Sequence, residues 1–360
     1  VDLTASNDDV ELILWRLANY ESALKNRLIN TAITSIKMEG QIPPAEFPDR
    51  FLDSKIGGGR CVIQPRDSTL FSILSNPADP RFAGEASRIL AEVSEVLNRM
   101  DGLVKLTPDF GRFGMLADLM YDFTPHVLGI GLDKGGCGGK SSYSATGVMA
   151  AASMSRVGLD HAQKLTLIGS NGAMGTNVAA HFLSRGNLDI ALCDVAYDDG
   201  TAQPPEGARE VLPSHFGRFT RECLRRGNVI VATTVGNELI NSAWQAMPRD
   251  TVILMAHNLA LPPHYAGLEL ARRVHDHGVT LLPGQVLTLG GALTSRLEWF
   301  WRQGNPGARF PKPLAHKLAS TAITLLVNQI LSAAEDERTS PYEVMLRLSD
   351  VNPQSEARNW

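Results

Sequence analysis

The feature that most constrains the fold is a glycine turn that lies between an apolar strand and a helix. Leu165–Ile168 reads as a buried strand, Gly175–Leu183 reads as a helix, and the turn between them has the spacing GxxGxxG. Such a turn lets backbone N–H groups approach a pyrophosphate, and the helix N-terminus adds a favourable dipole. The turn therefore predicts a dinucleotide-binding, Rossmann-type sheet. Its expected cofactor contacts are Gly169, Ser170, Asn171, Gly172, Ala173, Met174 and Gly175.

An acidic residue in the right place indicates which dinucleotide is bound. Asp194 ends the next predicted strand, Asp189–Cys193, and follows Gly172 by 22 residues. A carboxylate there accepts hydrogen bonds from the adenosine ribose and repels a 2′-phosphate, which favours NAD over NADP. The alternative is a glycine-rich turn that binds nothing, with Asp194 as a loop residue.

Strands and helices alternate through the second half of the chain, which predicts an α/β fold with a doubly wound parallel sheet. Ala232, Thr233 and Thr234 end one strand at the carboxyl edge, where nucleotides lie in such sheets, although they could equally form a simple strand end. We expect three regions, namely a substrate and dimerisation domain at 1–143, an NAD-binding domain at 144–304, and C-terminal helices at 305–360 that pack back across the domains. Further strands are expected at Val229–Ala232, Val252–Met255 and Val279–Leu282, and a long amphipathic helix at Leu314–Ala334.

The first half has weaker signals. Apolar spacing predicts helices over the first forty residues and over 80–100, and Val104–Thr107 reads as a strand. The segment Gly129–Ser144 contains GGCGGKS, which approaches a phosphate-binding loop, but Lys134 stands at the first required glycine. Because we find no strand before this segment and no helix starting at Lys140, we interpret it as a mobile interdomain loop.

Composition excludes several classes of protein. The formal net charge of −4 gives no case for nucleic acid or an anionic membrane as a partner. No apolar run approaches the roughly 18 residues that span a bilayer, and the N-terminus lacks the pattern of a secretory signal. The four cysteines are scattered without a CxxC pair, and there is no HExxH motif. We therefore expect a cytoplasmic protein without a metal site.

Six short motifs, in consistent order from Gly57 to the C-terminus, resemble those of the glutamate/leucine/phenylalanine/valine dehydrogenase family. GGGRCVI resembles the family's GGGK-x-V-I, and LTPDFG resembles T-A-E-D-V-G. The others are Ser144–Val148, Ala256–Asn258, Leu282–Gly291 and Thr339–Glu343. The resemblance implies a substrate domain followed by a Rossmann domain, with the active site in the cleft between them, and oxidative deamination of an L-amino acid or its reverse.

The resemblance also implies roles for individual residues. Asp109 matches the carboxylate that shuttles protons, although it could instead be a helix cap or turn aspartate. Arg60 stands where the family has a lysine, and since arginine keeps its proton it could only clamp or stabilise an anion, or form a structural salt bridge. Lys37 is a candidate for the family's second active-site lysine, although a solvated helix lysine is the simpler interpretation. Thr146 and Asn258 match cofactor contacts, and Thr288 replaces a substrate-binding asparagine.

These departures leave alternatives open. The first is an imine reductase, or a dehydrogenase of an unusual amine or hydroxy substrate, because hydride transfer needs orientation and one proton relay but not the missing lysine. The second, from another class, is a dinucleotide-binding subunit that has lost catalysis. We expect a homodimer that acts on a small-molecule substrate.

Overall fold

The computed structural model describes residues 6–108, 116–157, 164–186, 188–214, 219–234, 242–258, 260–262 and 264–351. They form two compact units. The first comprises Val1–Ala23, Ala45–Lys140 and Thr294–Lys312, and the second comprises Leu24–Pro44, Ser141–Leu293 and Pro313–Trp360. The main division between the units follows Lys140. Leu24–Pro44 joins the second unit because helix α2 (Leu24–Glu39) packs against two of its helices, α12 (Gly284–Leu287) and α15 (Pro341–Leu348).

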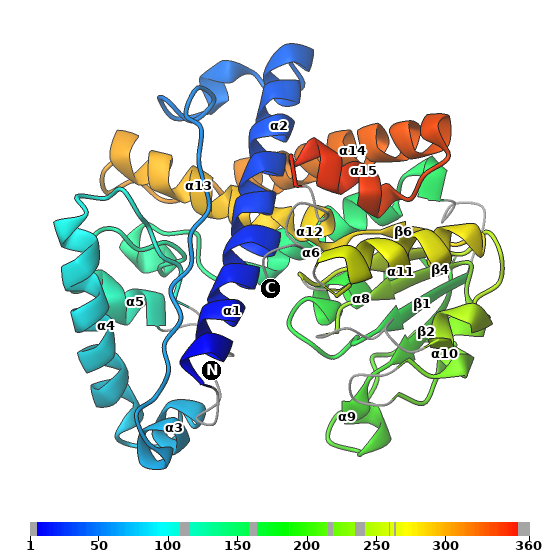
Figure 1. The fold of residues 1–360 in the computed structure, drawn as a ribbon, viewed down its shortest axis with the longest axis horizontal. Helices are drawn as coiled ribbons and strands as arrows, with labels where there is room; N and C mark the ends of the chain where they lie inside the picture. Colours follow the sequence, from blue (N-terminus) through cyan, green and yellow to red (C-terminus); the bar gives the residue numbers. More distant parts are fainter. Residues whose placement is uncertain are drawn as a thin grey trace. The chain divides into compact units, whose positions relative to one another are not determined.

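The second unit is built on a six-stranded sheet with the order β3-β2-β1-β4-β5-β6, in which every pair of neighbours is parallel (Figure 1). The order reverses between β1 and β4. Because parallel crossovers are right-handed, the connections on the two sides of this point lie on opposite faces of the sheet, which makes it doubly wound, as predicted. The strands are β1 (Lys164–Ile168), β2 (Asp189–Cys193), β3 (Glu210–Val211), β4 (Val229–Ala232), β5 (Val252–Met255) and β6 (Thr280–Leu282).

The predicted strands and helices of this unit agree closely with the structure. β2, β4 and β5 have the predicted bounds, and helix α8 is Gly175–Leu183. The stretch after Asp194, for which no strand or helix is predicted, contains the short helix α9 (Val195–Asp198) and the edge strand β3. Other helices of the unit are α6 (Ser141–Ala152), α10 (Arg221–Arg226), α11 (His264–Asp276) and the first residues of α13 (Leu289–Gly304), with the 3-10 turns η4 (Ser155–Val157) and η5 (Ser242–Ala246).

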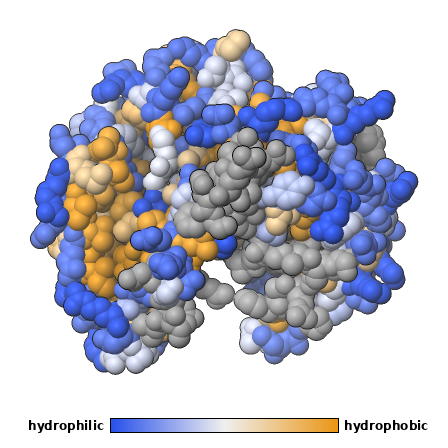
Figure 2. Space-filling model, viewed as in Figure 1, coloured by the Kyte–Doolittle hydropathy of each residue, from blue (hydrophilic) through white to orange (hydrophobic). Residues whose placement is uncertain are grey.

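The first unit is helical in the residues that the structure describes. Its elements are α1 (Asn7–Leu17), the π-helical turn η1 (Ala18–Ala23), η2 (Pro44–Glu46), which spans the unit boundary, α3 (Ser68–Ser75), α4 (Phe82–Arg99), α5 (Leu116–Tyr121), η3 (Leu132–Lys134) and residues 294–304 of α13. Helices α3, α4 and α5 share a core that includes Phe82, Leu90 and Leu116. The strand predicted at Val104–Thr107 is wrong, since Leu106 makes only an isolated parallel bridge to Val127. The apolar surface on the left of Figure 2 lies in the region of α4, where Val96 of the helix and Met100 directly after it are exposed.

The glycine-rich segment before Ser141 is organised by a buried glutamate rather than left as a mobile loop. The Glu298 carboxylate on α13 accepts hydrogen bonds from the N–H groups of Gly129 (2.9 Å), Ile130 (3.4 Å) and Cys137 (3.2 Å). Helix α6 begins at Ser141, directly after Lys140, so the expectation that no helix starts there is wrong. No described strand precedes the segment, so it is not a phosphate-binding loop of the strand–loop–helix type.

Two helices complete the second unit. Helix α14 (Lys312–Glu337) extends the predicted helix at both ends, and α15 follows Ser340. By length and hydropathy α14 could cross a membrane, although no such segment was expected from the sequence, but 44% of its most apolar stretch is buried in the protein. Core helices of globular proteins meet the same criterion. An ion pair of 2.5 Å between Arg272 on α11 and Glu343 on α15 joins helix α15 to helix α11.

Candidate functional site

The turn after β1 has the tight geometry that its glycines predict. Gly169 has a φ of +78°, a conformation that favours glycine, and its N–H donates to the Cys193 carbonyl over 2.8 Å. A side chain at Gly175 would overlap the carbonyl oxygen of Gly169. The start of α8 therefore lies directly against the end of β1, where its first-turn N–H groups can meet an anion.

Asp194 is held by two backbone N–H groups. It caps helix α9 by accepting from Ala196 N–H over 3.0 Å, and its other oxygen accepts from Asn171 N–H in the glycine turn over 2.8 Å. Ser170 lies beside it and is buried, with its hydroxyl 3.2 Å from the Tyr197 hydroxyl. Each carboxylate oxygen can accept more than one hydrogen bond, so Asp194 retains capacity for a ribose hydroxyl while it holds the turn.

Threonines mark the point where the strand order reverses. Thr233 donates its N–H to the Ile168 carbonyl over 2.8 Å, and its hydroxyl donates to the Gly169 carbonyl over 2.7 Å, so the ends of β1 and β4 are joined. The hydroxyl of Thr234 is buried and has no hydrogen-bond partner among the described residues. A buried hydroxyl at a switch point fits a bound polar ligand, because leaving it unpaired costs free energy. Ala232, the last residue of β4, is fully buried and offers only its backbone.

A second polar cluster lies beyond the carboxyl end of β5. The Asn258 side-chain oxygen accepts a hydrogen bond from the ammonium of Lys25 on α2 and lies 2.9 Å from the Thr288 hydroxyl. Asn258 and Thr288 were predicted from the sequence, and the structure brings them together. Lys25 was missed, although the signal was present, since it shares an apolar helix face with Ile29, Ala32 and Ile36. A lysine on such a face is uncommon enough to indicate a specific partner.

Thr146 lies within α6, and its hydroxyl contacts the Ser142 carbonyl (3.0 Å) and His316 Nδ1 (2.8 Å). The next residue, Gly147, has no room for a side chain because Ile323 and the Leu287 carbonyl lie against it, and Gly290 is equally close to the Tyr143 carbonyl. These glycines let α6 pack closely on the residues around Thr288. The motif glycines at 147 and 290 therefore serve helix packing.

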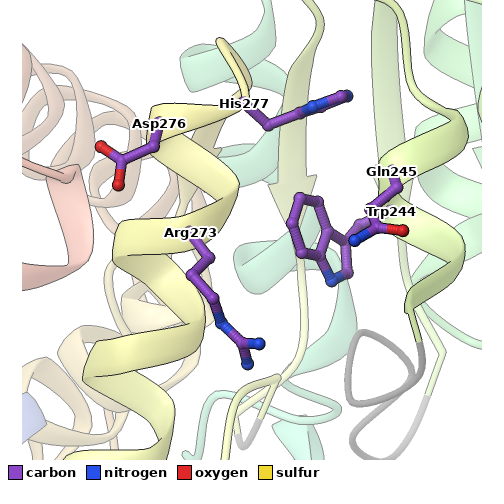
Figure 3. Close-up of a pocket in the computed structure, with 5 residues that line it drawn as sticks. All are labelled: Trp244, Gln245, Arg273, Asp276 and His277. Carbon is purple, nitrogen blue, oxygen red and sulfur yellow. The ribbon is translucent and has the colours of Figure 1, made fainter.

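The hollow in Figure 3, of about 420 Å³, lies away from these residues. It is lined by Trp244 and Gln245 of η5 and by Arg273, Asp276 and His277 at the end of α11, and the Asp276 side chain points away from Trp244. The chain enters β5 and β6 on this side, so the hollow lies at the amino ends of these strands. Ligands of doubly wound sheets bind at the carboxyl ends, so we assign no function to this hollow.

Comparison with known proteins identifies the fold. No family model matches the sequence, and no curated protein matches it. Among solved structures, the L-tryptophan dehydrogenase of Nostoc punctiforme is similar, with 13% identity, a TM-score of 0.64, and coverage of 99% of this chain and 88% of that one. A glutamate dehydrogenase of Plasmodium falciparum matches with 11% identity, a TM-score of 0.60, and coverage of 99% and 74%. The leucine-bound hetero-hexameric glutamate dehydrogenase of Thermus thermophilus matches with 18% identity, a TM-score of 0.57, and coverage of 76% and 69%.

The fold is that of the amino-acid dehydrogenases. The resemblance seen in six short motifs is thus confirmed at the level of fold. Within the Leu282–Gly291 motif, a side chain at Gly284 would overlap the carbonyl oxygens of His257 and Met255, so only glycine fits there.

The structure describes two of the three residues that were expected to carry catalysis. The Arg60 guanidinium forms an ion pair with Glu21 within the first unit, which is the structural alternative to a catalytic role. Lys37 is exposed in the last turn of α2, about 18 Å along the helix from Lys25. The structure therefore does not bring Lys37 to the Asn258–Thr288 cluster. Asp109 lies outside the described residues.

Proposed function

We propose that this chain is an NAD-dependent oxidoreductase of the amino-acid dehydrogenase type, acting on a C–N bond of a small substrate. The observation that carries the proposal is the Gly169–Gly175 turn, hydrogen-bonded to Asp194 at the switch side of a sheet with the order 3-2-1-4-5-6. This arrangement supplies N–H donors for a pyrophosphate and a carboxylate for a ribose. Oxidative deamination of an L-amino acid, or the reverse reaction, is the chemistry that best suits the fold.

The choice of NAD over NADP rests on Asp194. Its carboxylate is buried and fixed by Asn171 and Ala196, so it cannot move aside to admit a 2′-phosphate without losing two hydrogen bonds. A second negative charge at the same place would be repelled. We therefore expect NADH to bind more tightly than NADPH.

The residues of the chain would divide the work as follows. NAD, when bound, would supply the nicotinamide ring for hydride transfer. The turn, Thr146, Thr233, Thr234 and Asn258 orient the dinucleotide, and Thr288 contacts the substrate. Asp109 passes a proton between the substrate nitrogen and solvent. Arg60, which keeps its charge at all relevant pH values, could stabilise an anion only if its pair with Glu21 opened. Lys37 could contribute only if it moved from its exposed position in the last turn of α2.

A second candidate is reduction of an imine, or oxidation of an unusual amine or hydroxy substrate. The observation that favours it is the Arg60–Glu21 pair, since no lysine occupies the position that assists attack of water in deamination. A third candidate, from another class of protein, is a dinucleotide-binding subunit without catalytic activity. Arginine at position 60, where the family has a lysine, favours this candidate as well. We propose a homodimer for either case, and light scattering of the purified protein tests it.

Fluorescence titration with NADH and NADPH, followed by turnover assays of Asp109→Asn, separates these candidates. The proposal expects NADH to bind, Asp109→Asn to bind it equally well, and turnover to fall at least about a hundred-fold, as for loss of a general acid–base group. Turnover that survives in Asp109→Asn contradicts the proton-relay role. Failure to bind either nucleotide contradicts the proposal as a whole.

A further inference from the structure

Lys25 approaches a residue that the proposed function assigns to the cofactor. It is the second residue of α2 and is 8% exposed, on the helix face that also carries Leu24, Leu28 and Ile29. Its ammonium donates to the Asn258 side-chain oxygen, 233 positions along the chain. Burying an ammonium is costly unless it is hydrogen-bonded, so the contact is a specific one.

Asn258 lies at the edge of the sheet where a ligand would bind. It comes three residues after Met255, the last residue of β5. In a doubly wound sheet the two halves of a dinucleotide lie on either side of the point where the strand order reverses. Asp194, at the end of β2, takes the adenosine half, so Asn258, beyond β5, lies on the side of the nicotinamide half.

The amide of Asn258 has two ends with opposite hydrogen-bonding character, and its neighbours decide which end faces them. The carbonyl oxygen accepts, and the NH₂ group donates. Thr288 does not decide, because a hydroxyl can donate or accept, and its single proton has the Gly284 carbonyl within 2.7 Å as well as Asn258. Lys25 does decide, because an ammonium only donates. With the amide reversed, two donors would face each other.

We infer that Lys25 is a positioning residue that holds the Asn258 carbonyl toward α2 and thereby presents the Asn258 NH₂ group as a hydrogen-bond donor to an oxygen of the nicotinamide half of the dinucleotide. This inference rests on the proposed function for the identity of the ligand. Lys25 acts through Asn258 and needs no contact of its own with the ligand. It also gives a reason for a lysine on an otherwise apolar face of α2.

The test replaces the donor and its anchor separately and together. The variants are Asn258→Asp, Lys25→Met and the double variant, with Lys164→Met as the matched control. Lys164 is the exposed first residue of β1, at the amino end of the same sheet. Each protein is measured by thermal unfolding without ligand and by fluorescence titration with NADH.

Asn258→Asp keeps an acceptor for Lys25 but has no donor to present, so we expect NADH affinity to fall by about ten-fold or more. The thermal stability of the Asn258→Asp variant should depend on Lys25. We expect Asn258→Asp to lower the melting temperature by about 3 °C more when it is combined with Lys25→Met than when Lys25 is present. Lys25→Met should weaken NADH binding by about three-fold or more, because the amide is released. Lys164→Met should change neither quantity.

The two proposals fail in different ways. Equal NADH affinity in wild type and Asn258→Asp overturns this inference alone and leaves the proposed function standing. Absence of thermal coupling between positions 25 and 258 also overturns it, since the contact would then be missing. A wild-type protein that does not bind NADH overturns the proposed function and this inference together. A purely structural contact would lower stability without the selective loss of NADH affinity in Asn258→Asp.

Discussion

The N–H group of Asn171 donates to the Asp194 carboxylate over 2.8 Å, and this bond joins the glycine turn after β1 to the residue that directly follows β2. The two features that defined the candidate site in the sequence are therefore one hydrogen-bonded unit. The carboxylate also caps α9. Asp194 thus serves local structure and the proposed ribose contact together, and substitutions can separate the two roles.

Asp194→Ser keeps a good helix cap but removes the carboxylate, since serine is as effective at this position as aspartate. We expect the melting temperature to fall by about 2–4 °C, because the Asn171 N–H loses its acceptor, while the preference for NADH over NADPH falls by about ten-fold. Fluorescence titration with both nucleotides measures the ratio. An unchanged ratio would mean that Asp194 is a cap and has no part in the choice of cofactor.

Gly175→Ala tests the close approach of α8 to β1. The new methyl group would overlap the Gly169 carbonyl, so we expect a loss of about 1–3 kcal/mol in the free energy of unfolding, together with weaker NADH binding. Gly84→Ala is the matched control, because no atom lies within 4 Å of the added carbon in α4. That change should stabilise slightly, by about 0.5–1 kcal/mol. Chemical denaturation of both variants gives the comparison, and equal effects would contradict the packing described for Gly175.

The ion pair between Arg272 and Glu343 makes part of the stability depend on pH. Hydrogen bonds from Arg272, and then from Thr339, lower the pKa of Glu343 from its usual value near 4.5. The pair therefore stabilises the fold above that value, and its contribution is lost as the pH falls through the lower pKa of the folded state. We expect Glu343→Gln to cost about 0.5–1 kcal/mol at pH 7, and this cost should decrease as the pH falls below about 4.5. A cost that stays constant across this range would refute the assignment, and Glu92→Gln, in an exposed pair, is the control.

Cys193 and Cys223 form a buried thiol pair beside Asp194, with their sulfur atoms 3.0 Å apart. A bond of about 2.05 Å requires only a small further approach. The hydrogen bond from Cys193 lowers the pKa of Cys223 and so favours the reactive thiolate. With the exposed Cys61 first alkylated, we expect hydrogen peroxide to oxidise the pair to a disulfide, each peroxide being reduced to two waters. Mass spectrometry of the digested protein identifies the link, Cys223→Ser abolishes it, and persistence of both thiols would contradict the expectation.

The cofactor half was predictable because each of its signals is local. A buried parallel strand is a short apolar run, and β2, β4 and β5 are such runs with turn residues at both ends. The glycine turn and Asp194 have a fixed separation that a sequence displays directly. The exposed β3, which has no apolar face, and the short α9 were missed because neither has a hydrophobic pattern.

The Asn258–Thr288 cluster shows why the rest of the site was harder to predict from the sequence. Lys25 reaches it from the N-terminal region, and no pattern of spacing connects residues 233 positions apart. The segment at Val104–Thr107 has the composition of a strand but finds only one bridging partner, because pairing depends on a neighbour that local sequence does not specify. Arg60 was matched to an active-site position by its motif alone, and in the structure its guanidinium forms an ion pair with Glu21.

The most direct test of the account is absorbance at 340 nm, with NAD and NADP offered separately alongside a panel of L-amino acids. The same assay is then run in reverse with NADH, ammonia and the matching 2-oxo acids. The account predicts a signal with NAD and one class of substrate, lost in Asp109→Asn. No signal in either direction from a protein that binds NADH would contradict deamination of common amino acids and leave imine reduction or a non-catalytic role.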